Sequence, residues 1–114
     1  MNAVPAMAPD EESASPFTVL VVEDQDSVRA ALVGELHHAG VSDVLQAANG
    51  NMALHLFRSR RPDLVLLDIK LPGNDGYWVA QQMRVAESGD WTPIIFLSGL
   101  DGDLDVWRGI EAGG

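Results

Sequence analysis

The chain has 114 residues, enough for one domain with a sizeable core and too few for a second independent domain. Hydrophobic residues make up 46% and charged residues 21%, an ordinary globular balance that argues against wholesale disorder. Seventeen acidic against seven basic side chains give a formal net charge of -10, which disfavours direct binding to nucleic acid and to anionic membrane surfaces.

Cysteine is absent, so disulfides, thiolate metal sites and thiol nucleophiles are excluded, and the sequence suits a reducing cytoplasm. No apolar run approaches the roughly 18 residues that a membrane span needs. Residues 1–16 contain Pro5, Pro9 and the acidic run 10–12, with no basic residue and no continuous apolar segment. We therefore expect a flexible leader that is not a secretory signal, followed by one domain over residues 17–114.

Residues 17–22 form a short, β-branched, nearly continuous apolar run that ends at Glu23 and Asp24. This pattern is typical of a buried parallel strand. Asp26 or Ser27 can then cap a helix, along which apolar residues recur at helical spacing at Val28, Leu32, Leu36 and Ala39, before Gly40. The sequence therefore predicts a first strand–helix unit.

Two further units follow. A weaker strand at residues 44–47 leads to Asn49, a good N-cap for a second helix. Residues 64–67 form the strongest strand, which is again closed by an acid, Asp68, and followed by a turn over residues 71–76. The turn predicts the start of a third helix.

The third helix is expected to turn Val79 and Met83 inward. Residues 93–97 predict a fourth strand that ends at Ser98, and a fourth helix is expected from about Asp103, burying Leu104, Trp107 and Ile110. Short apolar strands that alternate with amphipathic helices predict an α/β fold with a mainly parallel sheet covered on both faces.

Polar side chains stand where three of these strands end. Strand one is followed by Glu23 and Asp24, strand three by Asp68, and strand four by Ser98. Ligands of open parallel sheets bind beyond the carboxyl ends of the strands, so we expect these side chains to lie together. Three neighbouring carboxylates repel one another, and a hard cation such as Mg²⁺ would offset that repulsion. With the ion bound, Asp68 is a candidate nucleophile for a phosphoryl group.

Four segments, in this order and spacing, resemble response-regulator receiver domains of two-component signalling. They are VVED at 21–24, PDLVLLDIKLPGNDG at 62–76, PIIFLSG at 93–99 and GIEAG at 109–113. The resemblance implies a flavodoxin-like (CheY-like), doubly wound parallel sheet, with four of the family's five strand–helix units present, (βα)4 of (βα)5. It also implies a signalling domain whose own chemistry is limited to self-phosphorylation and autodephosphorylation, and not an enzyme.

Carried over residue by residue, the resemblance makes Asp68 the phosphoacceptor. Asp24 becomes a direct Mg²⁺ ligand, Glu23 a ligand acting through water, and Lys70 a ligand through its backbone carbonyl. Ser98 stands at the family's switch hydroxyl position. The implied partners are a sensor histidine kinase or a phosphotransfer protein, which donates the phosphoryl group in the cytoplasm. An output domain, a partner protein or a second copy of the chain would receive the signal.

The resemblance covers residues 17–114 and stops after the predicted fourth helix. Family members continue into a fifth strand with an aromatic switch residue and a Lys that pairs with the phosphoryl group, and then a fifth helix. We therefore expect the chain to be a fragment of a longer regulator, or another chain to supply this element. Without it, residues 94–97 would form an exposed apolar sheet edge, and the acidic pocket would lack a fixed positive charge.

Two alternatives remain at this stage. The first is a receiver-like domain that acts only through protein contacts, independently of phosphorylation, which the lack of the fifth strand would favour. The second follows from Asp24 and Asp26 after an apolar strand, which resemble the nucleophile and general acid of haloacid-dehalogenase-like phosphatases. The second alternative leaves Asp68 and its turn unexplained and needs a longer chain.

Overall fold

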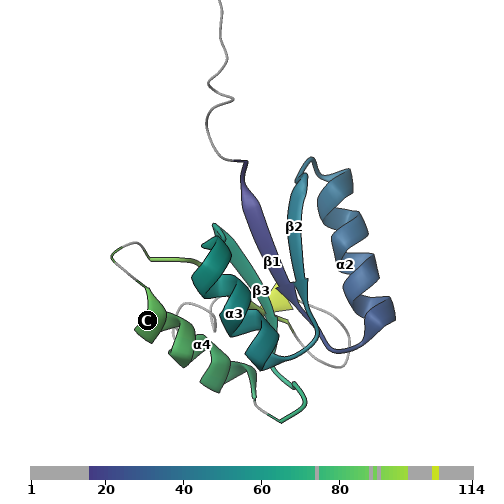
Figure 1. Cartoon of the computed structure of the whole chain (residues 1–114). Helices are drawn as coiled ribbons and strands as arrows, with labels where there is room; N and C mark the ends of the chain where they lie inside the picture. The colour runs from purple at the N-terminus through teal and green to yellow at the C-terminus, as the bar shows by residue number, and fades with distance from the viewer. Residues whose placement is uncertain (1–15, 74, 88, 90, 98–103, 106–114) are drawn as a thin grey trace, which may run out of the picture.

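The computed structural model describes residues 16–73, 75–87, 89, 91–97 and 104–105. Within this part of the chain, strands and helices alternate and build one sheet flanked by helices (Figure 1). The elements are β1 (Thr18–Val22), α2 (Asp26–His38), β2 (Asp43–Ala47), α3 (Gly50–Arg60), β3 (Leu64–Asp68), α4 (Gly76–Ala86), β4 (Ile94–Leu97) and β5 (Leu104–Asp105).

The sheet has the strand order β2-β1-β3-β4-β5. β1 to β4 are parallel, and β5 pairs antiparallel with β4. The first crossover runs outward from β1 to β2, and the next returns to place β3 on the other side of β1. The order therefore reverses between β1 and β3, which is the topological switch point of flavodoxin-like folds. The predicted flavodoxin-like α/β fold is confirmed.

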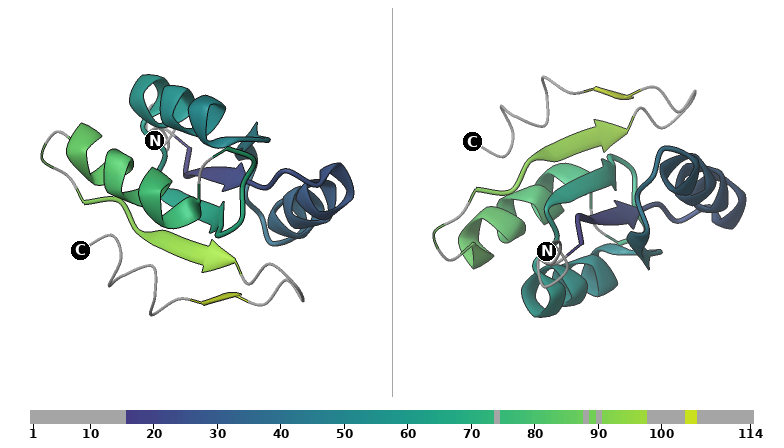
Figure 2. Two further views of the ribbon diagram at one scale, coloured as in Figure 1. Left: turned by 90° about the horizontal axis from the view of Figure 1, so that it is seen from below. Right: turned by 90° about the horizontal axis from the view of Figure 1, so that it is seen from above.

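The larger core lies between the sheet and the two helices α3 and α4, which run side by side on one face (Figure 2). Helix α3 buries Ala53 and Phe57, and α4 buries Val79, Ala80 and Met83, as the spacing of these residues predicts. They pack on strand residues of the same face, Leu20, Val22, Leu45, Ala47, Val65, Leu67, Ile94 and Phe96.

The opposite face of the sheet packs against α2 and is less deeply covered. Val19, Val21, Leu66 and Leu97 are buried there, but α2 itself has no buried residue. Its Leu32, Val33 and Leu36 are only partly buried against that face. Apolar packing therefore holds α2 less firmly than it holds α3 and α4.

The helix starts agree only in part with the sequence. Asn49 caps α3 as predicted, because its side chain accepts a hydrogen bond from the Met52 amide at 2.8 Å. The predicted cap of α2 by Asp26 or Ser27 is wrong. The N-cap is Gln25, which makes no side-chain cap hydrogen bond, and Asp26 is the first helical residue. The Asp26 carboxylate instead accepts from Arg29 Nη2 at 2.6 Å.

The predicted fourth helix is not found at the two residues of that segment that the structure describes. Leu104 and Asp105 form β5, paired with Leu97 and Phe96, so this part of the β4 edge is covered. Pairing satisfies the backbone groups of an apolar edge, which explains why extended structure replaces the expected helix there. The other residues of the predicted helix, including Trp107 and Ile110, lie outside the described part of the chain.

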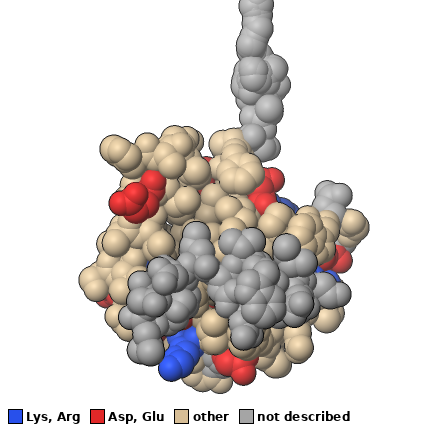
Figure 3. Space-filling view, turned by 180° about the vertical axis from the view of Figure 1, so that it is seen from behind, with Lys and Arg blue, Asp and Glu red and all other residues tan. Residues whose placement is uncertain are grey.

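Helices α2, α3 and α4 are all too short or too polar to cross a membrane, as far as the described residues go. Viewed from the side opposite to Figure 1, the described surface carries acidic and basic side chains singly, with uncharged surface between them (Figure 3). On this face the described acidic side chains are therefore not gathered into one patch.

Candidate metal site

Strand register brings Glu23 and Asp68 together at the switch point. Val22, the last residue of β1, pairs with Leu67 of β3, so the next residue along each strand is an acid. Neighbouring strands lie about 4.8 Å apart, which sets the spacing of the two backbones. Val21 and Leu66 lie on the α2 side of the sheet, and alternation places Glu23 and Asp68 on that same side.

Three carboxylates meet at this point. Glu23, Asp24 and Asp68 each offer an oxygen, and these oxygens lie within 4.8 Å of one another. Glu23 is 5% exposed and Asp68 is 4% exposed, whereas Asp24 is open to solvent. The cluster is therefore a partly buried group of acids with one side accessible to an incoming ligand.

Burial and mutual repulsion disfavour the charged form of the two inner acids. Burial raises the pKa of Glu23, and the nearby charges of Asp68 and Asp24 raise it further. Burial likewise raises the pKa of Asp68, with a further contribution from the charge of Asp24. Backbone N–H groups work against these effects, from Gln25 on Glu23 and from Lys70 on Asp68. The site would accept a positive charge favourably.

The loop after Asp68 is tied back onto the end of β3. The Lys70 amide donates to Asp68 Oδ1 at 3.3 Å, and Lys70 forms an isolated antiparallel bridge with Asp75. The Gly76 amide donates to the Ile69 carbonyl at 2.6 Å. A Cβ at Gly76 would clash with the Asp68 carbonyl and lie 2.9 Å from Ile69 Cα, so only glycine fits. Helix α4 therefore starts in direct contact with the backbone of Asp68.

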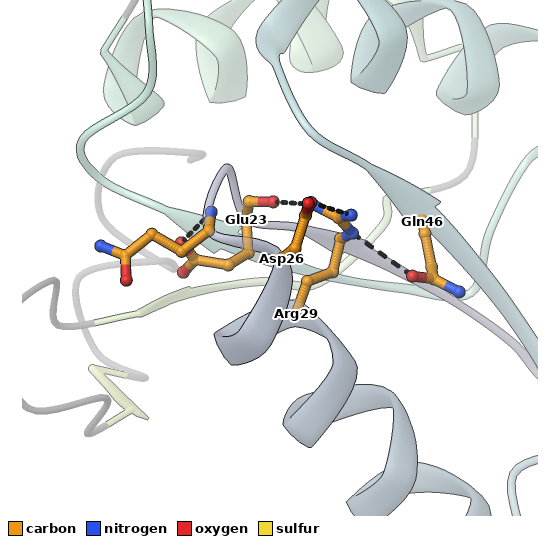
Figure 4. Close-up of polar contacts among 5 residues, drawn as sticks. Glu23, Asp26, Arg29 and Gln46 are labelled. Atoms are coloured by element: carbon orange, nitrogen blue, oxygen red, sulfur yellow. Dashed lines mark hydrogen bonds and ion pairs between the residues drawn. The ribbon is translucent and has the colours of Figure 1, made fainter.

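The loop after Glu23 is fixed by a second set of contacts (Figure 4). The Gln25 amide donates to Glu23 Oε2 at 3.0 Å. From the first turn of α2, Arg29 Nη1 donates to the Glu23 carbonyl at 2.8 Å, and Arg29 Nε donates to Gln46 Oε1 at 3.3 Å. Arg29 thus joins this loop to β2.

The donor set fits Mg²⁺. It consists of carboxylate oxygens, two of them buried and held by backbone N–H groups, and hard divalent ions prefer oxygen ligands. A divalent ion would also remove the repulsion that raises the pKa of Glu23 and Asp68. When bound, such an ion would supply Lewis-acid stabilisation of negative charge on a ligand at this site.

The described structure brings together some of the predicted site residues but does not include all of them. Glu23, Asp24 and Asp68 are brought together, and Lys70 follows two residues after Asp68. Ser98 lies outside the described residues, although β4 ends next to it at Leu97, which is in register with Asp68. The sequence reasoning missed Gly76 and Arg29. The i,i+3 spacing of Asp26 and Arg29 on a helix was the available signal for the latter.

Comparison with protein families matches residues 19–114 to the response regulator receiver domain. Among curated proteins, the transcriptional regulatory protein AfsQ1 of Streptomyces coelicolor is 42% identical over 96 residues, and YxdJ of Bacillus subtilis is 38% identical over 96 residues. Each alignment covers 84% of this chain. The chain spans only 41% and 40% of the lengths of these two relatives.

Comparison with solved structures indicates the same family. The receiver domain of the histidine kinase CKI1 from Arabidopsis thaliana, crystallised with Mg²⁺ and BeF3⁻, is 33% identical with a TM-score of 0.72. That alignment covers 92% of this chain and 81% of the other. A CheY-like receiver domain from Methylobacillus flagellatus is 26% identical with a TM-score of 0.69, covering 88% and 83%. The chain belongs to the response regulator receiver domain family of two-component signalling proteins.

Proposed function

We propose that the chain is a phosphoacceptor receiver, in which a phosphoryl group is transferred to Asp68 in the presence of Mg²⁺. The observation that carries the proposal is the meeting of Glu23, Asp24 and Asp68 at the switch point of a receiver-family sheet. Glu23, Asp24, Asp68 and the backbone carbonyl of Lys70 would hold the ion, Glu23 through water.

In the proposed reaction, an oxygen of Asp68 attacks the phosphorus of a phosphohistidine. The new O–P bond forms as the P–N bond breaks, and the leaving imidazole takes up a proton. The Lys70 amide orients the attacking carboxylate. Burial raises the pKa of Asp68, and the positive charge of the ion would favour the ionised carboxylate that attacks.

The proposed response uses the two segments that follow Asp68 and β4. Ser98 would donate its hydroxyl hydrogen bond to the phosphoryl group, because Leu97 before it is in register with Asp68. Gly76 lies in close contact with the Asp68 backbone, so a shift of that backbone would also displace the start of α4.

The proposed partners follow from the same assignment. The donor is a sensor histidine kinase or a phosphotransfer protein in the cytoplasm, and the recipient of the signal is an output domain, a partner protein or a second copy of the chain. Residues 1–16 are proposed as a leader and residues 17–114 as the receiver. The net charge of -10 makes direct contact with nucleic acid by this segment unfavourable. Turnover of an external substrate is not expected, only self-phosphorylation and autodephosphorylation.

The proposal is tested by incubating the chain with acetyl phosphate and measuring incorporated phosphate by intact-protein mass spectrometry. We expect one phosphoryl group, only with Mg²⁺, in wild type and in Glu35→Gln, whose residue is exposed on α2. Asp68→Asn should remain unmodified. Unchanged incorporation in Asp68→Asn would contradict the assignment.

The same samples separate the two alternatives. Steady hydrolysis of p-nitrophenyl phosphate, lost in Asp24→Asn and retained in Asp68→Asn, would indicate a phosphatase. Absence of both incorporation and hydrolysis in wild type would leave a domain that acts only through protein contacts.

A further inference from the structure

Arg29 is the side chain that connects the acidic loop to the rest of the fold (Figure 4). Its three nitrogens donate to three segments: Nη1 to the Glu23 carbonyl after β1, Nη2 to Asp26 Oδ1 in α2, and Nε to Gln46 Oε1 on β2. The guanidinium group is planar and rigid, so three such bonds fix the relative positions of their acceptors. The side chain is only 17% exposed.

Apart from Arg29, the loop is restrained mainly by main-chain hydrogen bonds, such as the bond from the Glu23 amide to the Ala47 carbonyl at 3.0 Å. The N-cap residue Gln25 makes no side-chain cap hydrogen bond, and α2 has no buried residue. Apolar packing therefore leaves the first turn of α2 loosely placed relative to the end of β1. The Arg29 contact with the Glu23 carbonyl supplies a direct restraint between them.

The same residue, Glu23, is held at both ends. Arg29 binds its backbone carbonyl, while the Gln25 amide binds its side-chain Oε2. Fixing both the carbonyl and the carboxylate determines where Glu23 and the following Asp24 present their oxygens. A metal site requires this kind of support, because ligands that are free to move must be ordered when the ion binds.

The guanidinium group of Arg29 makes no hydrogen bond to the carboxylate oxygens that would bind the metal. Its three hydrogen bonds end on the main-chain carbonyl of Glu23, on Asp26 and on Gln46, and none of them ends on a carboxylate of the acidic cluster. Arg29 thus orders the loop and leaves the carboxylates of Glu23, Asp24 and Asp68 available to a cation.

We propose that Arg29 is a positioning residue that pre-organises Glu23 and Asp24 for Mg²⁺. This inference rests on the proposed function of the acidic cluster as a metal site. A positioning role and a purely electrostatic role predict opposite changes in metal affinity when Arg29 is replaced. Removing a positive charge close to the cluster would, through charge alone, strengthen cation binding. Loss of positioning weakens it.

The test compares wild type with Arg29→Met, which keeps the apolar stem and removes every donor. Binding of Mn²⁺, an EPR-visible ion of the same charge and ligand preference, is titrated by following the signal of free ion. We expect the dissociation constant to rise about tenfold, the lower end of the usual effect of removing a group that orients metal ligands. Arg60→Met is the matched control, because it removes an exposed arginine paired with Asp43 and should leave the constant unchanged.

A second readout separates positioning from general damage. The rate of Asp68 phosphorylation by acetyl phosphate is measured against Mg²⁺ concentration. In Arg29→Met, the Mg²⁺ concentration for half-maximal rate should rise by a similar factor, while the rate at saturating Mg²⁺ stays within about twofold. An equal fall at all Mg²⁺ concentrations would contradict the inference.

Unchanged or tighter Mn²⁺ binding in Arg29→Met would also overturn it. If Arg29→Met does not fold, Gln46→Ala replaces it, because Gln46 is exposed and only one of the three contacts is lost. A smaller but measurable weakening is expected there, and no change would contradict the inference. Failure of wild type itself to bind Mn²⁺ would refute the proposed metal site, and is distinct from an unaltered constant in the variants.

Discussion

Glu23 and Asp68 occupy matching positions at the ends of neighbouring parallel strands. Each follows a residue of the Val22–Leu67 register pair, and each is almost fully buried. The fold thereby brings two carboxylates from residues far apart in the chain into one acidic cluster and raises the pKa of both. The cost of this arrangement without a cation is the basis of the first two predictions.

Replacing one of these acids should stabilise the metal-free protein. Asp68→Asn removes a buried charge that is repelled by its neighbours, while the amide oxygen can still accept the hydrogen bond from Lys70. We expect the free energy of unfolding in EDTA to rise on the order of 1 kcal/mol. Urea denaturation followed by circular dichroism measures it. With Mg²⁺ added, the wild type should gain more stability than the variant, and an equal gain would contradict the metal assignment.

The free energy of unfolding should also depend on pH, because the same two buried acids titrate. Because the pKa values of Glu23 and Asp68 are raised above 4.5 and 3.8, both groups bind protons more tightly in the folded chain. Their contribution to the free energy of unfolding is therefore lost as pH rises from those ordinary values through the raised ones. In EDTA, the free energy of unfolding of wild type minus that of the double variant Glu23→Gln, Asp68→Asn should therefore decrease as pH rises. Saturating Mg²⁺ should abolish it, and a difference that rises with pH in EDTA would contradict the account.

Gly76 should be intolerant of substitution. Gly76→Ala would drive a methyl group into the backbone of Asp68 and Ile69, and the loop would have to move. We expect a loss of about 1–3 kcal/mol in the free energy of unfolding and slower phosphorylation of Asp68. Gly34→Ala in α2 is the matched control, because its added Cβ meets nothing within 4 Å. That variant should gain about 0.5–1 kcal/mol, and equal stability of both variants would show that the close approach has no consequence.

Arg84 should support the start of β4. Its Nη1 donates to Glu87 and to the Thr92 carbonyl, and the guanidinium lies 5.1 Å from the centre of the Trp91 ring. Both charged side chains are 14% exposed, so Arg84→Met leaves the mostly buried carboxylate of Glu87 without its charged partner, with the Thr92 amide still donating to it. We expect a loss of about 3 kcal/mol, measured by urea denaturation.

The matched control for this prediction is the double variant Arg84→Met, Glu87→Met. It removes both charges, and it also removes Arg84 Nε and Nη2, which are buried without a hydrogen-bond partner among the described residues. This variant should be less destabilised than Arg84→Met alone. A larger loss in the double variant would contradict the argument from buried charge.

The strands and the meeting of the acids could be predicted because both depend on local pattern and simple topology. A short apolar run closed by an acid indicates where a parallel strand ends, and Asp24 and Asp68 both follow such runs. Parallel strands bring their carboxyl ends to one edge, so the cluster followed without knowledge of side-chain geometry. Asn49 was predicted as a cap for a similarly local reason.

The features that were missed depend on contacts across the fold. Asp26 looked like a cap, but Arg29 engages its carboxylate, and Arg29 in turn reaches Gln46, 17 residues away on β2. The restriction at Gly76 arises from the close approach of the Asp68 backbone. Leu104 pairs with the β4 edge instead of entering a helix, and helical spacing of apolar residues carries no information about such an edge.

The central claim is that Asp68 and Mg²⁺ form a phosphoryl site, and beryllofluoride binding tests it most directly, because BeF3⁻ mimics an aspartyl phosphate. Binding is followed by intrinsic tryptophan fluorescence, for which Trp78 in the first turn of α4 is a suitable reporter, its amide being held by Asp75. The account predicts a saturable change in wild type that requires Mg²⁺ and is lost in Asp68→Asn. A response that persists in Asp68→Asn, or no binding to wild type with Mg²⁺, would contradict it.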